Sequence, residues 1–162
     1  MVEETNQGNG PVGTINVLDP SPLNWLYITY NTVEELVRAT PDGTIEPAAM
    51  EDYRWLDGGY TLEVNVREGN RFPDGEPLNA HSVKRAFDEV MLWASPHPPG
   101  TQFNFAAGTT LEVTGEHSVR FHFPEPDGQA LGKLRAMHVM STAFWEGPGF
   151  GYERQGSGEG HW

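Results

Sequence analysis

The sequence predicts an α+β fold, a small mixed or antiparallel sheet with flanking helices, and three observations support it. Apolar and polar residues alternate strictly over Tyr60–Arg67, and a period of two is typical of a half-buried strand. Apolar residues then recur at helical spacing over Val83–Met91, as on the buried face of an amphipathic helix. Thirteen Pro and nineteen Gly among 162 residues imply many turns. A chain of this length has room for a single core.

The strand and the helix are joined by a turn that the sequence also specifies. Pro73-Asp74-Gly75 has turn chemistry, because proline fixes φ and glycine accepts a positive φ. Asn79 stands where a helix N-cap is expected. The apolar face of the strand comprises Tyr60, Leu62, Val64 and Val66, and the apolar stripe of the helix comprises Val83, Ala86, Phe87, Val90 and Met91.

Before this central unit, the sequence predicts a polar tail and three further segments. Residues 1–12 are polar and rich in glycine, so we expect them to be disordered. Apolar spacing predicts a helix over Leu23–Arg38, which a capping box at Asn31 and Glu34 restarts and the Pro41-Asp42-Gly43 turn ends. The other two segments are a short strand over Thr14–Leu18 and an extended connector over Ile45–Asp57, with a short helical turn near Ala48.

After the central unit comes a long loop, Trp93–Gly108, which contains three Pro and four aromatic or His side chains. Loops of this length within a compact domain are usually functional or disordered. A hairpin is predicted over Leu111–Thr114 and Val119–Phe123, followed by a helix over Gln129–Met140 and a Gly-rich tail over 146–160. In the second strand of the hairpin, one face holds Val119, Phe121 and Phe123, and the other holds Arg120 and His122.

Composition excludes several classes of function. The formal net charge of −13 makes nucleic acid and anionic lipid poor partners, because both would be repelled. The chain has no Cys, so disulfides and thiolate chemistry are excluded. No apolar run reaches membrane-spanning length, and we expect no membrane insertion. The N-terminus lacks a signal peptide, which predicts a cytoplasmic protein unless a signal has been removed.

Motifs for common chemistry are missing from the sequence. The six His include no pair at i, i+4 on one helix face and no H-E-x-x-H, so we predict no metal site. No G-x-S-x-G, Walker or dinucleotide glycine pattern is present, which argues against the common nucleophile and phosphate sites. We therefore expect no cofactor.

The central unit resembles the signature of the family 5 extracellular solute-binding proteins, the peptide-, dipeptide- and nickel-binding proteins of ABC importers. That signature reads approximately R-x-G-x-x-F-x-D-G at the end of a strand, then P-L-x-A-x-D-V and a helix. Ser82 replaces the Asp of the family pattern, and Glu159 replaces a Pro in a Gly-rich turn near the end. The resemblance covers about the whole chain but only the first third of a family member. The matching residues are Arg67, Gly69, Phe72, Asp74, Gly75, Pro77, Leu78, Ala80 and Val83.

The resemblance implies that the loop after the central helix, and the helical region beyond it, approach the ligand cleft. A guanidinium pairs with a carboxylate in bidentate fashion, and an indole covers apolar surface or a cation, which suits an amino-acid-like or peptide-like ligand. The structural alternative is that Trp93 and Trp145 are core residues and Arg135 a solvated helix residue. The candidate ligand-binding residues are Trp93, His97, Phe103, Arg135, His138 and Trp145, and the catalytic candidates, for any reaction, are His138 and Arg135.

The resemblance also implies a division of the chain and a partner. In the family, a segment like 45–150 is a small α+β domain inserted into a larger lobe, on which residues 13–44 and 151–162 would pack. We therefore expect residues 13–162 to form one solute-binding-protein-like domain, the small subunit of a split heteromer. A second polypeptide would supply the remaining lobes, with the small amino-acid-like or peptide-like ligand near the interface.

A second functional class stays open at this point. The chain could belong to a cytoplasmic, cofactor-independent biosynthetic enzyme that uses the same cleft. Such an enzyme would rely on positioning and on acid–base help from a His or a carboxylate. Ring closure of an amino-acid-derived metabolite, in which an internal amine displaces a leaving group, fits those means.

Overall fold

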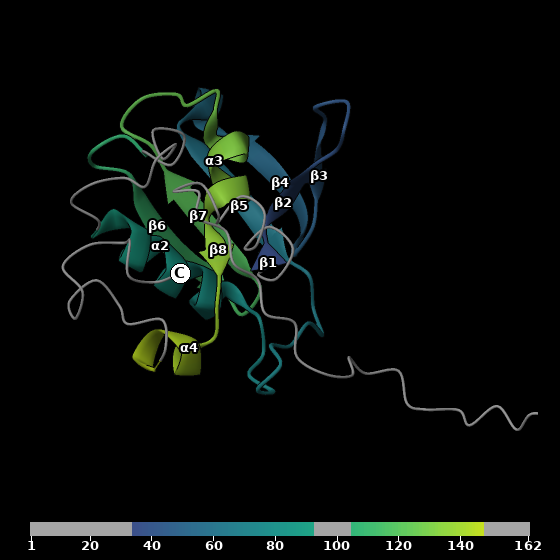
Figure 1. The fold of residues 1–162 in the computed structure, drawn as a ribbon. Helices are drawn as coiled ribbons and strands as arrows, with labels where there is room; N and C mark the ends of the chain where they lie inside the picture. Colours follow the sequence, from purple (N-terminus) through teal and green to yellow (C-terminus); the bar gives the residue numbers. More distant parts are fainter. Residues whose placement is uncertain (1–33, 93–104, 148–162) are drawn as a thin grey trace, which may run out of the picture.

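A four-stranded antiparallel sheet is the centre of the computed structural model, which describes residues 34–92 and 105–147 (Figure 1). A 3-10 turn, Asp57–Gly59 (η1), joins the first two strands, and the last two form the hairpin that the sequence predicts. The order across the sheet is β4-β5-β7-β6. The strands span Met50–Leu56 (β4), Thr61–Val66 (β5), Thr110–Gly115 (β6) and Ser118–His122 (β7).

The predicted central strand is confirmed as β5. Its apolar residues oppose those of β7, with Leu62 paired to Phe121 and Val64 to Val119, and all four are fully buried. Tyr60 differs from the prediction. It precedes the strand as the C-cap of η1, so its side chain leaves the apolar face and is 48% exposed.

The predicted N-cap of the central helix is also confirmed. The helix, α2, spans Ala80–Met91. The Asn79 side-chain oxygen accepts hydrogen bonds from the backbone N–H groups of His81, at 2.9 Å, and Ser82, at 3.3 Å. These bonds satisfy two of the N–H groups that the first turn of a helix leaves without partners.

The apolar stripe of α2 packs against β6 and β7. Phe87 lies at the centre of this contact, with its ring 5.7 Å from the Phe121 ring in an edge-on arrangement and 5.6 Å from the Phe105 ring. Met91, at the far end of the stripe, is 37% exposed. The fully buried or nearly buried members of the stripe are Val83, Ala86 and Phe87.

The helix predicted over Leu23–Arg38 is wrong where the structure describes it. Residues 34–39 instead form two short strands, Glu34–Glu35 (β1) and Val37–Ala39 (β2), and β2 pairs with Ile45–Pro47 (β3). The Leu36 carbonyl between them accepts hydrogen bonds from the N–H groups of Ala48 and Met50. Local apolar spacing suggests a helix, but pairing with strands that come later in the chain decides the conformation.

The connector predicted over Ile45–Asp57 is extended, as expected, but it forms the paired strands β3 and β4. The helical turn near Ala48 is wrong, because Ala48 and Ala49 form a bend in which the Ala49 N–H donates to the Glu35 carbonyl at 3.0 Å. The Pro41-Asp42-Gly43 turn is confirmed, although it joins β2 to β3 and does not end a helix.

The helix predicted over Gln129–Met140 ends early. It spans Ala130–Ala136 (α3), and Met137 leaves the helix with φ −87° and ψ 91°. His138–Val139 then forms a short strand, β8, that pairs with β1. A further helix that the sequence analysis does not predict, Thr142–Glu146 (α4), follows it.

These elements give the α+β class that the sequence predicts, with α2 on one face of the sheet (Figure 1). The expected tail 1–12 and the expected strand Thr14–Leu18 lie outside the described residues, as do most of the loop Trp93–Gly108 and of the tail 146–160. Within residues 34–92 and 105–147, no helix is both long and apolar enough to cross a membrane.

Candidate ligand-binding site

A buried glutamate and a buried histidine lie opposite each other in the register of β1 and β8. The register places Glu35 opposite His138, and the two residues are only 6% and 3% exposed. Directly opposed residues of an antiparallel pair share one face, with Cβ atoms about 5 Å apart. Two titratable groups from distant parts of the chain thus occupy one buried position, which is typical of a functional site.

The imidazole of His138 is held neutral at physiological pH. Burial lowers the pKa of His138 from 6.5 to about 4, because the surrounding protein disfavours the charged ring. A neutral imidazole has one nitrogen that donates and one that accepts a hydrogen bond. His138 is therefore suited to orient a polar ligand group without a charge of its own.

Arg135 and Trp145 lie on the same stretch of chain, before and after β8. Arg135 is in the last turn of α3 and is half-buried. Trp145 is in α4, only 2% exposed, and lies edge-on to Phe144 with the ring centroids 5.6 Å apart. The segment from α3 to α4 thus carries all the candidates that the structure describes. The burial of Trp145 also agrees with the alternative interpretation that this residue belongs to the core.

The other candidates cannot be placed. Trp93, His97 and Phe103 lie outside the described residues. Phe105, directly after them, is buried and has the Lys133 ammonium 5.9 Å from its ring centroid. The chain therefore re-enters the described fold beside α3, the helix that carries Arg135.

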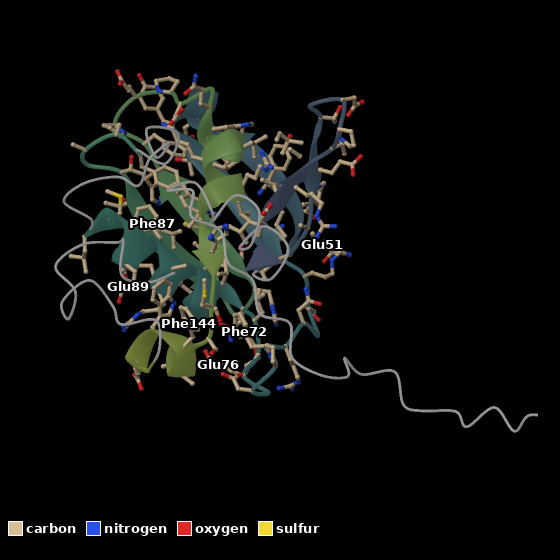
Figure 2. All side chains as sticks on the ribbon, viewed as in Figure 1. Glu51, Phe72, Glu76, Phe87, Glu89 and Phe144 are labelled. Carbon is tan, nitrogen blue, oxygen red and sulfur yellow. The ribbon has the colours of Figure 1, made fainter. Side chains whose placement is uncertain are left out.

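Sequence reasoning missed Glu35, which becomes notable only through its pairing with His138. It lay within the predicted helix, and no local signal connects it to a strand about one hundred residues later. Glu76, which lies beside α4 (Figure 2), was also missed. Its carboxylate accepts hydrogen bonds from the backbone N–H and the hydroxyl of Thr142, at 2.8 and 3.0 Å. The family signature around residues 72–76 therefore contacts the start of α4.

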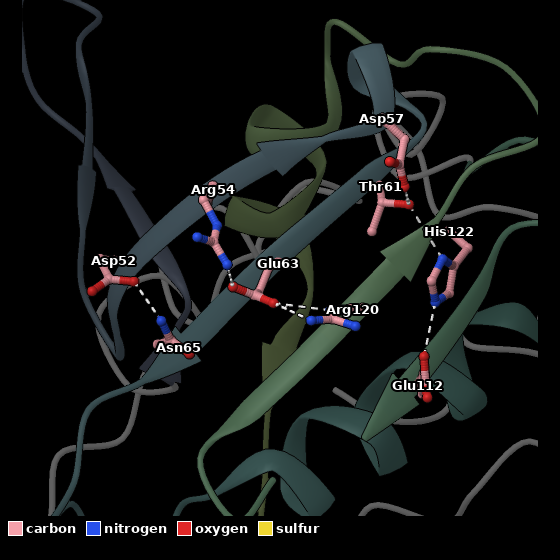
Figure 3. Close-up of polar contacts among 9 residues, drawn as sticks. All are labelled: Asp52, Arg54, Asp57, Thr61, Glu63, Asn65, Glu112, Arg120 and His122. Carbon is pink, nitrogen blue, oxygen red and sulfur yellow. Dashed lines mark hydrogen bonds and ion pairs between the residues drawn. The ribbon is translucent and has the colours of Figure 1, made fainter. Parts of the chain in front are cut away.

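The face of the four-stranded sheet that points away from α2 carries paired polar groups (Figure 3). Glu63 on β5 accepts hydrogen bonds from Arg120 at 2.9 Å and from Arg54 at 2.7 Å, and these two guanidinium groups, Arg120 first, hold the pKa of Glu63 below its usual value. The His122 ring lies 3.1 Å from the Glu112 carboxylate. Because these polar groups pair with one another, we interpret this face as a surface of satisfied polar contacts, in which Glu63 is 9% exposed and its arginine partners are more exposed.

Among residues 34–92 and 105–147, no group of three or more His, Asp or Glu side chains could hold a metal ion. The described candidates also form no nucleophile–base pair of the kind used in covalent catalysis. What the arrangement offers is a buried polar pair, a guanidinium and aromatic surface, which are the groups used for binding small polar molecules.

The solved structures to which the fold of this chain is similar include substrate-binding proteins of ABC transporters and oligopeptide-binding proteins. The oligopeptide-binding protein AppA of Bacillus subtilis, in complex with a nonapeptide, matches with a TM-score of 0.63 and 19% identity over 72% of this chain and 23% of that one. NikA of Brucella suis, in complex with Fe(III)-EDTA, matches with a TM-score of 0.60 and 25% identity over 71% of this chain and 24% of that one.

The chain belongs to the bacterial extracellular solute-binding proteins of family 5, whose middle-region model matches residues 44–157. The periplasmic α-galactoside-binding protein of Rhizobium meliloti is 27% identical over 139 residues, which are 73% of this chain and 20% of that protein. The resemblance to family 5 is therefore confirmed. The chain spans about a fifth of the length of the curated relatives it matches. The expectation of a cytoplasmic protein finds no support in a family described as extracellular.

Proposed function

We propose that this chain contributes one side of an extracytoplasmic solute-binding site for a small amino-acid-like or peptide-like ligand. The observation that carries the proposal is the buried Glu35–His138 pair, flanked by Arg135 within a family 5 fold. A relative with this fold was solved with a nonapeptide. No feature of the described residues favours the cyclising enzyme, which is not carried further.

Each candidate has a distinct role in this proposal. Arg135 pairs with a ligand carboxylate through its planar guanidinium. His138, neutral and opposite Glu35, exchanges hydrogen bonds with ligand amide groups, and the Glu35 carboxylate receives a ligand amine. The aromatic residues cover the apolar part of the ligand; they are Trp93, His97, Phe103 and Trp145.

Further lobes of the fold close the site in this proposal, because the curated relatives are about five times as long as the region they share with this chain. We predict that a second polypeptide carries those lobes. Purification of the tagged chain from its native host, followed by mass spectrometry, identifies any partner. Sedimentation with and without that partner then tests for a heteromer that buries more than about 1,000 Å². A compact monomer that binds ligand at micromolar concentration would contradict the split fold.

The test of the binding role uses trialanine and trialanine amide as probes, which differ only in the C-terminal carboxylate. Tryptophan fluorescence and calorimetry of the chain, together with any co-purified partner, measure both affinities. We expect the amide to bind roughly 10- to 100-fold more weakly, because a charge-assisted pair is lost. Melibiose, an α-galactoside, serves as the comparison ligand.

Variants locate the binding groups. Arg135→Gln should weaken trialanine and leave the amide unchanged, whereas His138→Gln should weaken both. Trp93→Ala should reduce binding far more than it lowers the melting temperature. The control is Lys84→Gln on α2, because Lys84 is half-exposed and pairs with Asp88 in an i, i+4 contact. Equal binding of both peptides by the native protein and by Arg135→Gln would contradict the role of Arg135.

A further inference from the structure

The turn that carries the family signature is bound to the start of α4. The Glu76 carboxylate accepts two hydrogen bonds from Thr142, a residue 66 positions later in the chain, at 2.8 Å from the backbone N–H and 3.0 Å from the hydroxyl. In the same turn, the nearby Ser141 side chain is the main cause that holds the pKa of Asp74 below its usual value. The start of α4 is thus bound to the turn through Glu76, which lies beside this helix (Figure 2).

The turn is rigid enough to act as an anchor. The Phe72 N–H donates to the Glu76 carbonyl and the Gly75 N–H to the Phe72 carbonyl, both at 2.9 Å. Gly75 has φ +92°, a conformation that a residue with a Cβ adopts only at a cost. The Glu76 N–H also donates to the Asp74 carboxylate at 2.9 Å, which closes the turn at the residue that contacts Thr142.

The segment that receives these bonds has little stability of its own. α4 has five residues, far fewer than an isolated helix needs, and β8 has two. The first N–H groups of a helix need acceptors from outside. Glu76 provides one for Thr142, and the Ser141 hydroxyl provides one for Phe144 at 3.2 Å. The position of the β8–α4 segment, and how well ordered it is, therefore depend on contacts from elsewhere in the fold.

His138 and Trp145 stand on either side of this anchored point, in β8 and α4. We propose that Glu76, whose backbone N–H is bonded to Asp74, is a positioning residue that holds the β8–α4 segment so that His138 and Trp145 keep their places in the ligand site. The last part of this inference rests on the proposed solute-binding function. The anchoring itself does not.

The first experiment measures anchoring without any ligand. Amide hydrogen exchange of residues 137–147 is compared in the native chain, Glu76→Ala, Glu76→Gln and Thr142→Val. We expect Glu76→Ala to speed exchange at Thr142–Gly147 by about tenfold, the effect of losing hydrogen bonds to a charged group. Glu76→Gln retains an oxygen for the Thr142 N–H and an NH₂ group for its hydroxyl, so it should restore most of the protection.

Two further variants keep the result interpretable. Thr142→Val removes only the hydroxyl contact and should have an intermediate effect, which remains measurable if Glu76→Ala fails to fold. Glu68→Ala removes the same charge from an exposed position on the preceding turn and should leave exchange unchanged. Unchanged exchange in both Glu76→Ala and Thr142→Val would overturn the anchoring.

The second experiment measures trialanine affinity in the same variants. Glu76→Ala should weaken binding about tenfold and Glu76→Gln by less than about threefold, in proportion to their exchange rates. Faster exchange with unchanged affinity would overturn the positioning role while leaving the anchor intact. If the native protein binds no peptide, the proposed function fails, and the exchange data still decide the anchoring by themselves.

Discussion

Two parts of this molecule are held together in different ways. The sheet β4-β5-β7-β6 with α2 is joined along whole strands and around a cluster of aromatic rings that includes Phe87 and Phe121. The segment from α3 to α4 relies on a two-residue strand pair with β1 and on side-chain bonds from the Asp74–Glu76 turn. The described candidates Arg135, His138 and Trp145 belong to the second part. The proposed binding chemistry of these residues thus lies in the part with fewer contacts.

The largest effect should come from the sheet side of this comparison. Phe87→Ala removes a buried ring that touches two other aromatic rings, so we expect it to lower the free energy of unfolding by about 3–5 kcal/mol. Urea denaturation followed by circular dichroism measures the change. Met91→Ala is the matched control on the same helix, because Met91 is exposed and should lose much less. A loss below about 1 kcal/mol for Phe87→Ala would mean that the aromatic cluster is not central to stability.

On the α3–α4 side, the expected signature is a dependence of stability on pH. The folded state keeps His138 neutral until its pKa of about 4, whereas the unfolded chain takes up the proton near 6.5. Stability is therefore lost as the pH falls from about 6.5 towards 4, by up to about 3 kcal/mol. His138→Phe should remove this part of the pH dependence, whereas His81→Gln, at an exposed position, should retain it. Parallel pH profiles for the native chain and His138→Phe would contradict the buried, neutral state.

The central unit could be predicted from sequence because its signals are local. The alternation over Tyr60–Arg67, the Pro73-Asp74-Gly75 turn and the Asn79 cap each act within a few residues. The strands β1 and β8 could not be predicted, since Leu36 and Met137 fit a helical pattern and only the distant partner makes each segment extended. The strand β2 pairs locally with β3 across the predicted turn, but its apolar spacing favoured a helix. For the same reason, Arg135 and His138 were recognised as residue types suited to a ligand, but Glu35 was not.

A smaller effect is expected at the junction between the turn and α2. Asn79→Ala should destabilise the chain by about 1 kcal/mol, the usual value of an N-cap, because the N–H groups of His81 and Ser82 lose their acceptor. Thermal unfolding measures this change. Asn79→Asp keeps the acceptor and should be close to the native chain. An equal loss in both variants would show that the cap does not act through that oxygen.

The smallest effect should come from the charged face of the sheet. Glu63→Gln weakens the bonds to Arg120 and Arg54, but both arginine side chains are partly or largely exposed, so solvent screens the loss. Because the folded-state pKa of Glu63 is lowered, its contribution is present above pH 4.5 and is lost as the pH falls through the folded pKa. Melting curves at low and high salt should differ less for Glu63→Gln than for the native chain. If the native chain and Glu63→Gln respond equally to salt, the bonds of Glu63 do not contribute to stability.

The pairing of Glu35 with His138 also has a consequence for the order in which the chain folds. The hairpin of β6 and β7 closes a loop of a few residues, whereas β1 and β8 meet only after about one hundred residues have been brought together. Closing the longer loop costs more chain entropy, and the two-residue strand pair that it forms offsets little of that cost. We expect the proposed ligand pocket to assemble last, on a sheet that is already formed, so that a solute bound there would chiefly slow the first step of unfolding.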